Sequence, residues 1–116
     1  MGQGPTSMIA DTIPQWDAMR TPETREVEDF LRTLFDRADA YRYNTAVIRL
    51  RVVDPRFEGM PFDDRDELVE PSIHKLPKDT RDDIVTLLTL APSELTGYNR
   101  RSLINHEFDD PTPSRL

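Results

Sequence analysis

Cysteine is absent from this chain of 116 residues. The protein therefore has no disulfide, no thiolate nucleophile and no cysteine of its own for zinc or an iron–sulfur cluster. Its glycines are too few and too scattered for a phosphate-binding loop; they are Gly2, Gly4, Gly59 and Gly97. The chain also lacks a signal-peptide pattern and any apolar run of about 18 residues, so we expect a soluble, cytoplasmic protein without a membrane partner.

Basic residues are few relative to acidic ones. The chain has 15 Lys and Arg against 22 Asp and Glu, so its formal net charge is −7 and its isoelectric point is about 4.7. This balance repels phosphate backbones, because Lys and Arg supply most of the affinity for them. The composition therefore argues against nucleic acid as a partner.

Proline marks the ends of the folded part. The ten prolines fall mostly near the two termini or at element ends, where ordered structure is expected to thin out. We predict a flexible arm at 1–20, a single domain at 21–104 and a disordered acidic, proline-containing tail at 105–116. Trp16 and Met19 are apolar exceptions within the arm, which is interpreted as a loosely packed lid over the core edge or as a partner-binding arm.

The clearest strand pattern, around which the rest of the chain is organised, lies at 46–53. Apolar residues at every second position alternate with Arg49 and Arg51, as expected of a strand with one buried face. Pro55 ends the strand, because proline has no N–H for pairing.

Three segments are predicted to be helical. The first, at 22–40, has Thr21 as its N-cap and apolar residues at helical spacing. The second, at 63–76, begins with carboxylates that complement the helix dipole, and Pro71 is expected to break or kink it. The third is a short helix at 92–97.

The apolar run at 83–90 fits two interpretations. Its spacing permits a helix, but it is short, rich in β-branched residues and followed by Pro92. A lone strand at 46–53 would leave its backbone groups unpaired, so we assign 83–90 as a buried strand parallel to it. For Tyr41–Asn44, a short extra strand and a simple cover of the sheet edge are both open.

The predicted fold class is therefore α/β in two layers. It consists of a small mixed sheet of two to three strands with the helices on one face.

No catalytic, cofactor or metal site emerges from the sequence. Asp66, Glu70 and His74 have the spacing of one helix face, but Pro71 interrupts that helix and the dipole alone explains its acidic start. No nucleophile lies next to a plausible base, so an enzyme is not predicted.

Between Val52 and Glu94 the chain resembles the BolA family. Three motifs carry the resemblance in the family's order and spacing; they are Phe57-Glu58-Gly59, Arg65-Asp66-Glu67-Leu68-Val69 and Thr89-Leu90-Ala91-Pro92-Ser93-Glu94. The resemblance implies a fold like that of a type II KH domain, although the GxxG loop with which KH domains bind nucleic acid is absent.

The chain departs from the BolA pattern at two family histidines. Asp66 stands at one and Asp83 at the other, where the family supplies an iron–sulfur ligand when paired with a monothiol glutaredoxin. A carboxylate is a poorer ligand for such a cluster. The segment between Ala40 and Phe57 also looks too short for the family's two antiparallel strands, so one strand is expected to be shortened or missing.

These features predict a non-enzymatic, BolA-like protein-interaction adaptor or regulatory domain without iron–sulfur ligation. The alternatives are a small homo-oligomeric structural or regulatory domain and a KH-like nucleic-acid-binding module. A protein partner or a second copy is expected to bind a basic, aromatic patch; its residues are Arg49, Arg51, Tyr41 and Tyr43. The competing interpretation is that both arginines pair with the protein's own carboxylates or lie under the N-terminal arm.

Overall fold

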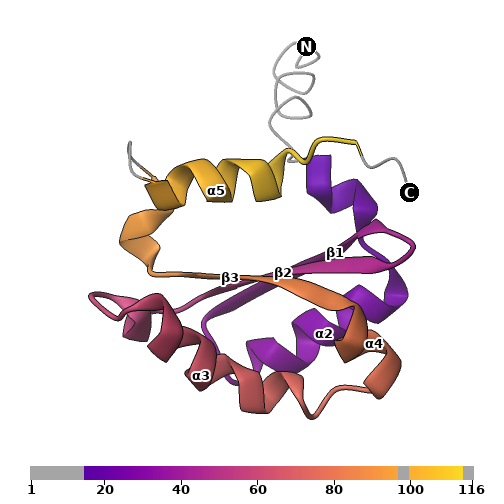
Figure 1. The fold of residues 1–116 in the computed structure, drawn as a ribbon, viewed down its shortest axis with the longest axis horizontal. Helices are drawn as coiled ribbons and strands as arrows, with labels where there is room; N and C mark the ends of the chain where they lie inside the picture. The colour runs from indigo at the N-terminus through magenta and orange to yellow at the C-terminus, as the bar shows by residue number, and fades with distance from the viewer. Residues whose placement is uncertain (1–14, 97–99, 114–116) are drawn as a thin grey trace, which may run out of the picture.

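The protein is built on a mixed three-stranded sheet with helices packed against it (Figure 1). The computed structural model describes residues 15–96 and 100–113. Strand β2 (Val47–Val53) lies between β1 (Arg37–Asn44), which is antiparallel to it, and β3 (Ile84–Leu90), which is parallel. The predicted α/β class, the strand at 83–90 and its parallel pairing are confirmed.

The first helix is shorter than predicted. Helix α2 (Pro22–Arg32) begins at Thr21, whose side-chain oxygen accepts a hydrogen bond from the backbone N–H of Thr24. It ends well before residue 40, because residues from Arg37 onward pair with β2. Ala38 and Ala40 still reach the core, but they do so from alternate positions of a strand.

The expectation of a missing strand is wrong. The eight residues of β1 and the seven of β2 form two antiparallel strands before Phe57. Both strands fit into this segment because α2 ends at Arg32, so residues 37–44 can pair with β2. Tyr41–Asn44 accordingly belong to a full strand.

The main core lies between the sheet and helices α2 and α3 (Phe62–Ile73) (Figure 1). The apolar face of β2 contributes Ile48, Leu50 and Val52, all fully buried. Pro71 lies inside α3 without breaking it, at an exposed position. A short helix that the sequence did not predict, α4 (Lys78–Asp83), leads directly into β3.

The opposite face of the sheet is covered by two terminal elements (Figure 1). The 3-10 turn η1 (Gln15–Met19) and helix α5 (Arg100–Asp109) enclose a second apolar cluster that contains Trp16 and Phe108. Residues 15–20 thus form a lid, whereas arm residues 1–14 lie outside the described residues. The disordered tail expected at 105–116 is wrong for 105–109, where Asn105 and Phe108 are buried.

Two short 3-10 turns complete the described chain. Turn η2 (Pro55–Phe57) follows β2, and η3 (Pro92–Glu94) occupies part of the segment predicted as a helix at 92–97. None of the helices in the described ranges is long and apolar enough to cross a membrane.

Candidate functional site: a groove beside strand β3

The predicted patch is largely internal, because α5 covers it. Arg51 is 1% exposed and donates hydrogen bonds to Asp39 Oδ2 at 2.8 Å and to Asp109 Oδ1 and Asn105 Oδ1, both at 2.7 Å. Its guanidinium also lies 4.3 Å from the ring centroid of Phe108. The prediction that Arg51 is presented at a free surface is therefore wrong, and the competing interpretation of internal ion pairs applies to it.

Tyr41 is equally enclosed. Its hydroxyl donates to the backbone oxygen of Phe108 at 2.9 Å, and burial raises its pKa above the ordinary value. Arg49 donates to the Tyr41 hydroxyl at 3.1 Å and lies over the Tyr43 ring, 3.8 Å from its centroid. Arg49 and Tyr43 are partly exposed, and their role in partner binding stays a prediction.

Two of the BolA-like motifs meet at one buried guanidinium. Arg65, which is 1% exposed, donates to both carboxylate oxygens of Glu94, at 2.7 and 3.0 Å. It also donates to the backbone oxygens of Thr89 at 3.0 Å and Met60 at 2.7 Å. Arg65 thereby joins the start of α3 to the end of β3, which gives both motifs a structural role.

The third motif forms the turn into α3 beside the same guanidinium. The Arg65 guanidinium lies 5.7 Å from the ring centroid of Phe57, which is fully buried. Gly59 has a φ of +72°, a left-handed conformation that side chains with a Cβ rarely adopt. Glycine at this position is therefore explained by the backbone.

Asp83, which the BolA resemblance aligns with a cluster ligand, is held in an ion pair. Its Oδ2 accepts from Arg42 Nη2 at 2.8 Å, and Arg42 also donates to Glu23. The hydrogen bond from Arg42 to Glu23 is the largest cause of an upward shift in the Arg42 pKa. The Asp83 carboxylate is thus engaged with β1 and α2 through Arg42.

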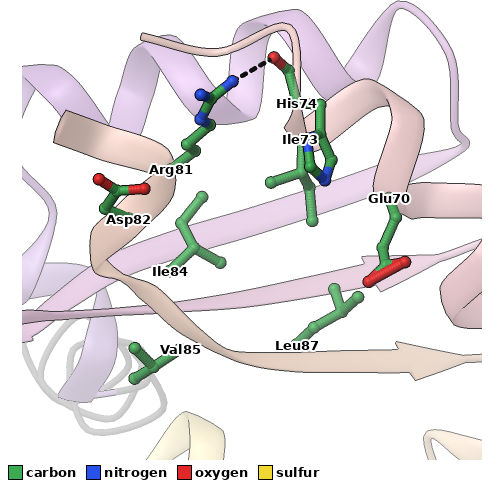
Figure 2. A pocket seen from close by; sticks show the side chains of 8 residues that line it. All are labelled: Glu70, Ile73, His74, Arg81, Asp82, Ile84, Val85 and Leu87. Atoms are coloured by element: carbon green, nitrogen blue, oxygen red, sulfur yellow. Dashed lines mark hydrogen bonds between the residues drawn. The ribbon is translucent and has the colours of Figure 1, made fainter. Parts of the chain in front are cut away.

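A groove lies beside this position, between α3, α4 and the start of β3 (Figure 2). Its volume is about 270 Å³, and its apolar lining comes from Ile73, Ile84, Val85 and Leu87. Val85 is 65% exposed at an irregularity of the β2–β3 register. Glu70 extends its carboxylate toward Leu87, while the backbone oxygen of His74 accepts from Arg81 at 2.9 Å.

The groove and its surroundings hold charged side chains but no metal-binding group among the described residues. Pro71 leaves α3 intact, but the described residues contain no group of three or more acidic, histidine or cysteine side chains placed to hold a metal ion. The Asp66 pKa is raised by burial and, to a lesser extent, by Glu70 and Asp63. The groove combines its apolar floor with the charged side chains of Glu70, Arg81 and Asp82.

The sequence does not predict the groove. Glu70 and His74 stand out in it only as spaced metal-ligand candidates, and Val85 and Leu87 only as members of a buried strand. The uncharged run at 84–90 was the available signal, since a strand of this composition at a sheet edge is a template for pairing. Neither its edge position nor its register irregularity can be read from local sequence.

Comparisons with known proteins assign no family to this chain. Its class is therefore the one that the fold defines, an α/β domain with a mixed three-stranded sheet. No protein-family model, no curated protein and no solved structure matches this chain.

Proposed function

We propose that this protein is a non-enzymatic, BolA-like protein-interaction adaptor that does not ligate an iron–sulfur cluster. The observation that carries the proposal is the groove beside β3, where an apolar floor and the exposed Val85 adjoin a sheet edge. An exposed apolar surface next to an unpaired strand edge is a typical protein-binding feature.

The BolA-like part of the proposal is supported by the contacts among the motifs. Arg65 and Glu94, which belong to different motifs, form a buried ion pair, and Phe57 from the remaining motif lies beside it. Two antiparallel strands precede Phe57, which is the arrangement that the resemblance implies. The shared residues thus support a scaffold of this type.

The Asp83–Arg42 ion pair supports the absence of cluster ligation. Binding of iron through Asp83 would first require the loss of a 2.8 Å charge-assisted hydrogen bond. We predict that mixing the protein with a cluster-loaded monothiol glutaredoxin leaves the visible absorption spectrum of the cluster unchanged. A spectral change that disappears in Asp83→Asn but persists in the neighbouring control Asp82→Asn would contradict this prediction.

An affinity purification from the native host tests the adaptor function. The tagged full chain is expected to retain one protein in a fixed ratio, whereas the tag alone retains none. Recovery of the chain with only itself would favour the homo-oligomeric alternative, and recovery of nuclease-sensitive material would favour a nucleic-acid-binding module. Either of these results would contradict the adaptor.

A further inference from the structure

The outer edge of β3 presents backbone groups that can pair with another strand. The backbone oxygen of Leu90 accepts from Asp54 N at 3.1 Å, on the side of β2. That of Thr89 accepts from Arg65 Nη1 at 3.0 Å, on the outer side. Because alternate residues of a strand direct their N–H and C=O groups to opposite sides, Leu87 also directs both groups outward.

The other edge of the described sheet is already occupied. On β1, the Ala40 N–H donates to Glu28 Oε2 at 2.9 Å, and the Ala38 oxygen accepts from Arg32 Nε at 3.0 Å. Both side chains come from α2, which therefore caps this edge with charged groups, a common protection against pairing with other chains. On β3, Thr89 is likewise buried and bonded by Arg65, so within the described sheet the edge that remains for a partner is the part of β3 from its start to Leu87.

From these observations we infer that β3 binds an extended, basic segment of a partner protein as a fourth strand. The inference rests on the proposed adaptor function and names the surface and the kind of partner. Main-chain hydrogen bonds to Leu87 would supply affinity, and the groove would receive an alternate side chain of the added strand. An apolar side chain fits the floor formed by Ile84 and Leu87 (Figure 2).

The charges of the groove and of the whole protein favour a basic partner segment. Glu70 extends over the groove and forms no ion pair with any described residue, so it is available to a Lys or Arg of the added strand. By contrast, Asp82 is paired with Lys78 at 2.6 Å. The cationic side chain of the groove lining, Arg81, donates to the backbone oxygen of His74. The net charge of −7 favours a basic partner. A second copy is disfavoured, because it carries the same charge and its own β3 contains no Lys or Arg.

The test uses the full chain labelled with nitrogen-15 and two synthetic peptides of alternating sequence. The lysine–valine peptide is expected to shift the amide signal of Leu87 saturably, and added salt is expected to weaken its binding. The glutamate–valine peptide is expected to leave that signal unchanged. Equal binding of both peptides, or no saturable shift at Leu87 with the basic one, would overturn the inference.

Two glutamate variants of α3 isolate the contribution of the groove. Glu70→Gln is expected to weaken binding of the basic peptide several-fold, whereas Glu67→Gln makes the same charge change outside the groove lining and is expected to leave it unchanged. Both residues are exposed, and thermal melting verifies that both variants fold. Equal effects of the two variants would overturn the role of Glu70.

A measurement of the oligomeric state tests whether a second copy occupies the edge instead. Sedimentation velocity is expected to give a monomer. A dimer whose formation shifts the Leu87 amide signal would assign the edge to a second copy and overturn the inference of a basic partner. Capture of a partner from the host together with failure of the basic peptide would reject this inference while leaving the adaptor function intact.

Discussion

Arg49 and Arg51 lie on the same face of β2, two residues apart, yet their surroundings differ. Arg51 is enclosed by Asp39, Asp109 and Asn105, whereas Arg49 is partly exposed and forms no ion pair with the described residues. The strand period predicts that both face away from the main core. It does not predict which of them is covered, because Asp109 lies 58 residues away along the chain.

This difference predicts unequal effects of two matched substitutions. Arg51→Met removes two of the hydrogen bonds to the buried Asp39, which keeps the one from Arg37, and leaves the buried Asn105 without its arginine donor, so we expect it to lower the free energy of unfolding by about 3 kcal/mol. Arg49→Met is expected to cost less than about 1 kcal/mol. Urea unfolding of both variants measures the difference, and equal costs would show that α5 does not enclose Arg51 in solution.

Asp66 gives a prediction about pH. Burial, Glu70 and Asp63 raise its pKa in the folded state, so the folded state binds this proton more tightly than the unfolded state does. Ionised Asp66 therefore lowers stability at neutral pH, and this cost disappears as the pH falls through the raised pKa.

We accordingly expect Asp66→Asn to raise the melting temperature at pH 7, with the gain shrinking as the pH is lowered toward about 4. Glu67→Gln, on an exposed position of the same helix, serves as the control and should give no such gain. Melting curves across this pH range provide the measurement. A gain independent of pH would show that ionisation of Asp66 is not the cause.

At the scale of elements, the sequence predicts the central strands better than the ends of the helices. The alternation at 46–53 and the need to pair that strand predict β2 and β3 correctly. The apolar spacing after Arg32 continues the helical pattern, but strand pairing at Arg37 overrides it. Helix α5 is not predicted because its short segment is mostly polar. Among its side chains that the structure describes, Asn105 and Phe108 are buried, and they gain their cover from β1, β2 and η1.

The docking of α5 can be tested through the single tryptophan. Trp16 packs against Phe108 with ring centroids 5.7 Å apart and is 5% exposed. Phe108→Ala is expected to shift the tryptophan emission to longer wavelength and to cost about 3 kcal/mol of stability. Ile104→Ala, on a 43% exposed position of the same helix, should change neither quantity appreciably. An unshifted emission maximum in Phe108→Ala would contradict the docking of α5 over this cluster.

At the scale of the whole molecule, both faces of the sheet are covered and one of its edges is capped by α2. The sequence predicted a basic patch on a sheet face, but the terminal elements η1 and α5 cover most of that face. The exposed feature is instead the edge of β3. Local sequence does not show that β3 is an edge strand, because this depends on the order of the strands in the sheet. We propose that the protein partner binds at this edge.

Amide hydrogen exchange of the full chain, alone and with the protein captured from its host, tests this claim most directly. We expect the partner to slow exchange at Leu87, whose N–H group faces outward, and to leave exchange around Arg49 and Tyr43 unchanged. Slower exchange at β2 near Arg49 with no change along β3 would contradict it and would place the partner on the sheet face instead.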